Sequence, residues 1–298
     1  MNAPSLLTLL DTWELDPVVT TAVVVSAVVY GCAAHTPGRP ARQRVRWPVQ
    51  RTAAFLAGLA AVGFALESGL DVYDDQLLSV HMVQHLVLIL VAAPLLLAGR
   101  PVTLAVRALP PTGRRRLVRF LRGRFVGTLS RPAVGLLAFG ITMLATHLTP
   151  LYALALVNNN VHEGEHLLYL ISGLLFWAVL IPPGPVARRL DGLGQVVYLL
   201  LGMPFMSVVG VIFETGSTPR YHQYVTAARG FGISALSDQR LAGTLMWLAG
   251  TLAMGALALT LAWRAMVSEE HAMRRREAYA EHPVEHTAAT NVVTGKPG

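Results

Sequence analysis

Seven apolar runs, each long enough to cross a lipid bilayer as a helix, constrain the fold of this chain more than any other feature. A hydrocarbon core about 30 Å thick needs about 20 apolar residues in helical conformation. Such runs occupy residues 17–34, 51–70, 76–99, 132–151, 161–181, 193–214 and 240–264. The sequence therefore predicts an all-α fold, a polytopic membrane bundle of seven transmembrane helices.

The composition agrees with lipid as the main solvent of the chain. Only 14% of the 298 residues are charged and 53% are hydrophobic, whereas a soluble domain usually has about 25% charged residues. The formal net charge is +7, but the basic residues lie between the apolar runs. This placement indicates membrane topology and argues against a nucleic-acid partner. The single cysteine, Cys32, allows no internal disulfide and no metal site built on cysteine pairs.

The arginines predict how the bundle is oriented, because short cytoplasmic loops of membrane proteins collect Lys and Arg. Twenty arginines fall on one side of the seven runs, whereas three fall on the other side. The first set includes Arg39, Arg42, Arg44, Arg188 and Arg189. We therefore expect the N-terminus outside and the C-terminus in the cytoplasm of a multi-pass protein of the plasma (inner) membrane.

This orientation divides the chain into three parts. Residues 1–16 are expected to form an outer N-terminal segment, and residues 17–267 the seven-helix transmembrane domain. The first run is expected to be an uncleaved anchor, because no basic residue precedes it and arginines follow it. Residues 268–298 are expected to form a cytoplasmic, largely mobile tail.

Two histidine pairs lie inside the apolar runs, where ionisable side chains are energetically costly. His81 and His85, in "HMVQH", are four residues apart and therefore share one helix face. His162 and His166, in "HEGEH", have the same spacing, and Glu165 lies on their face. A pair of this kind is commonly only packed and hydrogen-bonded, so the argument depends on whether the pairs meet.

The predicted directions of the helices place both pairs, together with His147, in the outer half of the membrane. Three helices of one bundle that bring imidazoles to a common depth provide what a metal site needs. We therefore predict a metal site in the outer half of the bundle.

Two further residues are weaker candidates for the same site. Met246, near the outer start of the last run, carries a thioether of the kind that binds Cu(I). His222 lies in the outer loop 215–239, where it could cover or relay the metal together with Tyr221 and Tyr224. Four other histidines are expected to have no part in the site: His35, His271, His282 and His286.

Four separated motifs, in order along the chain, resemble a known family. They are "HMVQHLVLILVAAPLLLAGRP", "THLTPLYALAL", "HEGEHLLYLISGLLFW" and "SDQRLAGTLMW". Together they resemble the multi-spanning CtaG-type cytochrome c oxidase assembly factors over residues 51–263. The resemblance implies a non-enzymatic role in the maturation of a haem–copper oxidase, with copper delivered to oxidase subunits, or received from a copper donor, on the extracytoplasmic face.

The resemblance also implies which residues serve that role. The family's histidine positions fall on His81, His85, His147, His162 and His166, and its acid falls on Glu165. The motif that opens the last span falls on Asp238, Gln239, Met246 and Trp247. The chain departs from the family at Thr146, where an aromatic residue often precedes the histidine.

Two other functions remain open from the sequence. "HEGEH" reads as H-x-x-E-H, the pattern of a zinc hydrolase in which two histidines hold zinc and a glutamate activates water. Histidines on facing helices can also ligate haem axially in an electron-transfer protein. Copper without turnover, zinc with hydrolysis, or a haem absorption band would distinguish the three. We rank them in that order, with zinc as the alternative metal.

Overall fold

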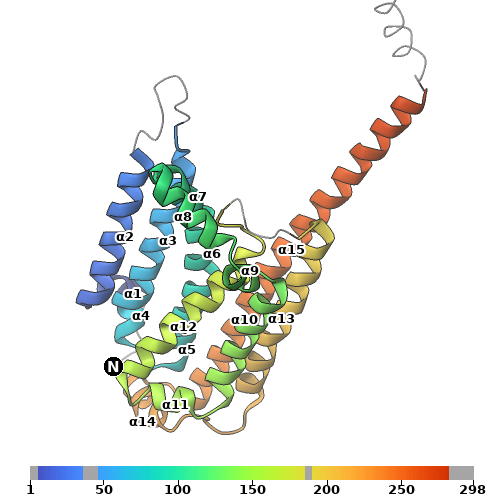
Figure 1. Cartoon of the computed structure of the whole chain (residues 1–298). Coiled ribbons are helices and arrows are strands. Elements are labelled where there is room, and N and C mark those ends of the chain that lie inside the picture. The colour runs from blue at the N-terminus through green and yellow to red at the C-terminus, as the bar shows by residue number, and fades with distance from the viewer. Residues whose placement is uncertain (1–5, 36–45, 185–189, 282–298) are drawn as a thin grey trace, which may run out of the picture.

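The computed structural model describes residues 6–35, 46–184 and 190–281, and this part of the chain is helical without a β-strand (Figure 1). The prediction of an all-α fold is therefore confirmed. Several residues used in the sequence argument lie outside the described part: Arg39, Arg42, Arg44, Arg188, Arg189, His282, His286 and the rest of the tail from 282 to 298.

The helices follow one another with short connections. The N-terminal half contains α1 (Leu6–Asp11), α2 (Pro17–His35), α3 (Val49–Glu67), α4 (Gly69–Val72), α5 (Leu78–Leu86), the π-helix η2 (Val87–Ala92), α6 (Ala93–Ala98), α7 (Pro101–Ala108), α8 (Pro111–Leu121) and α9 (Arg124–Leu129). The C-terminal half contains α10 (Pro132–Leu148), α11 (Leu151–Ala155), α12 (Asn159–Ala178), α13 (Gly192–Thr215), α14 (Gln223–Ala227), the 3₁₀ helix η3 (Ala228–Phe231) and α15 (Ala235–Glu281).

Five helical segments of the described chain are long and apolar enough to cross a membrane. They are Pro17–His35, Val49–Glu67, Leu78–Ala108, Gly192–Thr215 and Ala235–His271. The remaining two predicted spans are also helical, but α10 has only 17 residues, and α12, with 20 residues, carries two histidines and two glutamates. The number of seven transmembrane helices stays a prediction.

Exposed apolar side chains cover the outside of the bundle, as expected for helices that face lipid. On α2, for example, Val24 and Val29 are 52% and 62% exposed. The interior instead combines large apolar side chains such as Phe139 and Phe213 with buried polar groups. The chain therefore has an apolar surface around a partly polar centre.

A proline determines the shape of the helix that carries the first histidine pair. Pro94 has no backbone N–H, so it cannot donate a hydrogen bond to a carbonyl of the preceding turn. The helix is π-helical immediately before it, at Val87–Ala92, and the carbonyl of Ile89 accepts a 2.8 Å hydrogen bond from Nε1 of Trp177 instead. Because Trp177 belongs to α12, this bond holds α12 against the segment that continues α5.

Close packing of α13 against α15 depends on two glycines. A Cβ at Gly243 would lie 2.4 Å from the carbonyl oxygen of Gly210, and one at Gly210 would lie 2.7 Å from the carbonyl oxygen of Gly243. The two backbones can therefore approach only because both positions lack a side chain. The start of α15 also lies beside the start of α5, where Asp238 bonds to Leu78 and Ser79.

The two ends of the bundle differ in what they contain. Helices α7 and α8 lie at the upper end in Figure 1, whereas α11 and α14 lie at the lower end. The start of α5, the end of α10 and the start of α12 point toward that lower end. All the histidines of the two pairs, together with His147, are carried by these three helix ends.

Candidate metal centre

Five imidazoles from three helices form one continuous cluster. His81 and His85 lie on α5, His147 lies at the end of α10, and His162 and His166 lie near the start of α12. The ring centroids of each spacing-four pair are 4.4 Å apart, and those of His85 and His147 are 5.7 Å apart. The structure thus brings together all five histidines that the sequence placed at a common depth.

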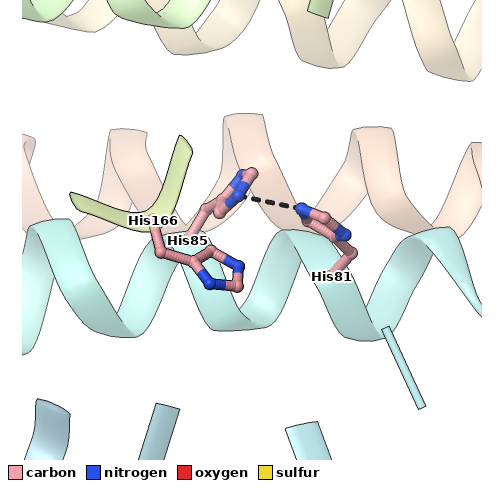
Figure 2. Close-up of side chains that lie close together, drawn as sticks. All are labelled: His81, His85 and His166. Carbon is pink, nitrogen blue, oxygen red and sulfur yellow. Dashed lines mark hydrogen bonds between the residues drawn. The ribbon is translucent and has the colours of Figure 1, made fainter. Parts of the chain in front are cut away.

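Three of these histidines form what we call the inner group: His81, His85 and His166. One ligand nitrogen from each lies within 4.8 Å of the others. Figure 2 shows the three rings close together. A hydrogen bond of 2.9 Å joins the Nε2 atoms of His81 and His85, and the Nδ1 atoms of both are buried without a hydrogen-bond partner among the described residues. Three converging neutral imidazoles are a ligand set for copper or zinc.

A second set, the outer group, consists of Asp74, His81 and His162, and its ligand atoms also lie within 4.8 Å of one another. Nε2 of His162 lies 3.2 Å from Oδ2 of Asp74. The sequence analysis did not identify Asp74 as a ligand. The signal was present, because Asp74 lies in the short connection "DVYDD", seven residues before His81 and on the same side of the predicted membrane.

Gln84 fixes the orientation and the tautomer of His166. The Gln84 amide nitrogen donates to the carbonyl of Ala65 and to Oδ1 of Asp71, both at 3.0 Å, so its oxygen is the atom that faces Nε2 of His166 at 3.0 Å. Since an amide oxygen only accepts, Nε2 of His166 carries the proton and Nδ1 keeps the lone pair that can bind an ion. Metal-ligating histidines are commonly held in this way by a hydrogen bond to the other ring nitrogen.

His147 lies beside the inner group and faces a methionine. Its Nδ1 lies 3.0 Å from the carbonyl oxygen of Met143 and 2.9 Å from the hydroxyl of Tyr169, and its Nε2 lies 3.1 Å from Sδ of Met82. Thr146, the position at which the chain departs from the family motif, forms hydrogen bonds with both His147 and Tyr169. The hydroxyl groups of Thr146 and Tyr169 therefore hold the His147 ring at Nδ1. Its other nitrogen, Nε2, faces the thioether sulfur of Met82.

Glu165 is a buried acid without a hydrogen-bond partner. Only 3% of the residue is exposed, and neither carboxylate oxygen forms a hydrogen bond with the described residues. A buried carboxylate in this state is costly unless it is protonated or lies near a cation. Its position one residue before His166 puts it beside the cluster.

Asp71 and Asp74 lie in the connection between α3 and α5, where both are withdrawn from water. Burial and the nearby Asp74 together raise the pKa of Asp71 to about 7, although the charge of His162 and the hydrogen bond from Gln84 oppose this. Burial also raises the pKa of Asp74, although the hydrogen bond and the charge of His162 oppose this. Two acids in this environment would be stabilised in their ionised form by a nearby cation.

Tyrosines of the 215–239 loop cover the cluster. The Tyr221 hydroxyl donates a 2.7 Å hydrogen bond to the carbonyl of His147, and the Tyr224 hydroxyl donates a 2.8 Å bond to the carbonyl of Asp74. Tyr152 of α11 packs against Tyr221 and His81 with tilted rings, its ring centroid 4.4 Å from that of Tyr221 and 4.9 Å from that of His81. The loop is therefore anchored on the end of α10 and on Asp74 of the outer group.

The two weaker candidates lie on other helices, α14 and α15. His222 is exposed at the start of α14, between the two buried tyrosines. Met246 is only 1% exposed and lies inside the bundle on α15. Neither belongs to the inner or the outer group as the described residues form them.

A bundle of apolar helices around a buried cluster of imidazoles defines a helical membrane protein with a centre suited to a metal ion. Comparison with protein families gives the particular class. Residues 28–268 match the family described as the cytochrome c oxidase caa3 assembly factor, Caa3_CtaG. The chain belongs to this family, and the resemblance that the sequence motifs indicated is confirmed.

Similar proteins are found in mycobacteria. An uncharacterized protein of Mycobacterium bovis and one of Mycobacterium tuberculosis are each 33% identical to this chain over 254 residues. An uncharacterized protein of Mycobacterium leprae is 28% identical over 259 residues. These matches cover 82–84% of this chain but only 38% of each relative, so the chain corresponds to less than half of their length. No solved structure matches the chain.

Proposed function

We propose that this protein binds copper through its histidine cluster and presents the ion for the maturation of cytochrome c oxidase. The observation that carries the proposal is the inner group, in which nitrogens of His81, His85 and His166 converge within 4.8 Å. Membership of the assembly-factor family supports a role in oxidase maturation, because a haem–copper oxidase needs copper as well as haem.

Three features of the site support a cationic cargo, and copper in particular. Imidazole suits copper and zinc, whereas a thioether favours Cu(I), and Sδ of Met82 lies 3.1 Å from Nε2 of His147. An ion held by neutral imidazoles keeps its positive charge, which Glu165 could balance from its buried position. The copper is cargo in this proposal, so no reaction on the protein is required.

The proposed topology puts this site at the extracytoplasmic face. Here α10 and α12 cross the membrane together with the five long segments, the N-terminus lies outside, and the arginine-rich helix α8 lies in the cytoplasm with its neighbour α9. Support comes from the location of α7 and α8 at the end of the bundle opposite to α11 and α14 (Figure 1). Oxidase subunits or a copper donor would then dock over α11, α14 and the tyrosines beneath them.

The zinc hydrolase is the weaker alternative. In an H-x-x-E-H hydrolase both histidines would hold the same ion. Here His162 belongs to the outer group and contacts Asp74. His166 belongs to the inner group and is hydrogen-bonded to Gln84. The same metal analysis decides between zinc, haem and copper.

The test is metal analysis of the full chain purified in mild detergent. We expect about one copper ion per chain after incubation with copper and removal of the excess. Replacing both His81 and His85 by alanine should abolish most of this binding, whereas His271→Ala, at an exposed position on α15, should not. Unchanged copper content in a folded double variant would refute the proposed site, and zinc or haem in place of copper would refute the proposed cargo.

A further inference from the structure

The outer group offers two ligand atoms that the inner group does not use, together with His81, which both groups share. Oδ2 of Asp74 and Nε2 of His162 are buried atoms in close polar contact, 3.2 Å apart. The Asp74 side chain is 3% exposed. A buried carboxylate beside an imidazole, with a second imidazole nitrogen within 4.8 Å of both, is an arrangement that suits a metal ion.

The exposed fractions of the histidine side chains show which of the two groups lies nearer to the surface. The His162 side chain is 16% exposed, whereas His81, His85 and His166 are 0%, 1% and 5% exposed. An ion from outside the protein therefore meets His162 before it can reach the inner histidines. Asp71 and Asp74 lie at this point, and the negative charge that these acids carry when ionised attracts cations.

His81 belongs to both groups and connects them. Its Nε2 faces His85, and its other ring nitrogen points away from that contact, as Figure 2 shows. An imidazole has two nitrogens that point in different directions, so one ring can contribute to either group. A neutral imidazole has only one nitrogen with a free lone pair at a time, so His81 can bind an ion in one group or the other, and the two groups compete for a single ion.

We propose that the outer group is a receiving site that takes up Cu²⁺ near the surface and passes it through His81 to the inner group. This inference rests on the proposed function, because the inner group must be a copper site. In the transfer, the bonds to Asp74, to His162 and to the outward nitrogen of His81 break, and bonds to Nε2 of His81, to His85 and to His166 form. The ion keeps its charge and no electron moves. The single ring proton of His81 lies on Nε2, toward His85, while the ion is in the outer group, and it moves to the other ring nitrogen of His81 when Nε2 binds the ion.

The rate of copper uptake separates the two groups. Full-length protein in detergent is mixed with Cu²⁺ buffered by glycine, and the electron paramagnetic resonance spectrum is recorded over time. The superhyperfine splitting of this spectrum reports how many nitrogens bind the ion. Wild-type protein should end with a spectrum of three nitrogens. Asp74→Asn should reach the same final spectrum, but at a rate lower by about tenfold or more. His162→Asn should behave in the same way, so the test does not depend on the folding of one variant.

A variant of the inner group gives the converse result. In His85→Ala the ion should stop in the outer group, with a spectrum of two nitrogens and one oxygen, and a chelator should remove it faster than from the wild type. Asp75→Asn is the matched control, because Asp75 is the exposed neighbour of Asp74, and its uptake should equal that of the wild type.

The failure of this inference differs from the failure of the proposed function. If wild-type protein holds copper at three nitrogens but both Asp74→Asn and His162→Asn load at the wild-type rate, the receiving site is wrong and the copper site stands. The same conclusion follows if folded His85→Ala holds no copper. If the wild type itself holds no copper, both proposals are wrong.

Discussion

The carboxylate of Asp238 accepts a 2.6 Å hydrogen bond from the backbone N–H of Leu78, 160 residues earlier in the chain. Asp238 lies in the first turn of α15, and Leu78 is the first residue of α5. The same carboxylate also accepts bonds from the backbone N–H and the hydroxyl of Ser79. The Asp238 side chain therefore caps, from α15, the N-terminal end of the helix that carries His81 and His85, where Leu77 is the N-cap residue.

Loss of this cap should weaken both the fold and the metal site. Asp238→Ala leaves two buried N–H groups of α5 without an acceptor, which we expect to cost about 1–2 kcal/mol of unfolding free energy. Thermal unfolding in detergent measures this cost. Copper affinity should fall with it, since the histidine-bearing end of α5 frays. A variant with wild-type unfolding temperature and wild-type copper affinity would contradict the capping role.

Gln84→Leu should lower copper affinity without removing a ligand. The substitution removes the acceptor that holds the proton on Nε2 of His166, and loss of such a partner typically costs about 10–100-fold in metal affinity. Titration against a copper chelator measures the change. Gln223→Leu, on the exposed face of α14, is the control and should bind copper as the wild type does. Equal affinities of the two variants would show that Gln84 does not orient His166.

The stability of the metal-free protein should fall as the pH rises from about 4 to about 7. The pKa of Asp71 is raised to about 7 in the folded state, against about 3.9 in an unfolded chain. Between these values the folded state holds a proton that the unfolded state has lost, so unfolding becomes easier with rising pH and levels off above pH 7.

Asp71→Asn tests this pH dependence directly. The asparagine oxygen can still accept the hydrogen bond from the Gln84 amide, but it cannot ionise. The variant should therefore lose part of the slope of unfolding temperature against pH and be more stable than the wild type at pH 8. Asp75→Asn, at an exposed position, should keep the slope. A slope unaffected by Asp71→Asn would contradict the raised pKa.

Membrane orientation can be tested with single cysteines. In a Cys32→Ser background, a cysteine at Asn159, at the start of α12, should react with an impermeant thiol reagent added to intact cells. A cysteine at Gly113, on α8, should react only after the cells are opened. The reverse pattern would put the histidine cluster at the cytoplasmic face and remove the route to the outer side of the oxidase.

Sequence spacing was sufficient to predict the five clustered histidines, because four-residue spacing fixes a helix face and the order of the spans fixes depth. It did not predict the contribution of Asp74. That residue lies in an irregular connection, and its place beside His162 depends on how Tyr224 holds its carbonyl. Sequence spacing also could not predict that Gln84 orients His166. The two residues are 82 positions apart on different helices, and their contact depends on a side-chain rotamer.

The helix around Pro94 gives a further example of this limit. A proline indicates an irregular helix, but the π-helical turn at Val87–Ala92 depends on Trp177 of another helix, which takes up the freed carbonyl of Ile89. Met246 was proposed for its thioether and its place near the outer start of the last span, and His222 for its place in the outer loop. The structure gives each a location, one buried on α15 and one exposed on α14, and their part in the site stays a prediction.

The measurement that tests the central claim most directly is the copper content of cytochrome c oxidase from cells that lack this protein, grown at limiting copper. We predict an oxidase with its haem but with copper strongly depleted. Copper should be restored by the wild-type gene and not by a variant with His81 and His85 replaced by alanine. A fully metallated, active oxidase in the deletion strain would contradict the account, and the histidine cluster would then serve another chemistry.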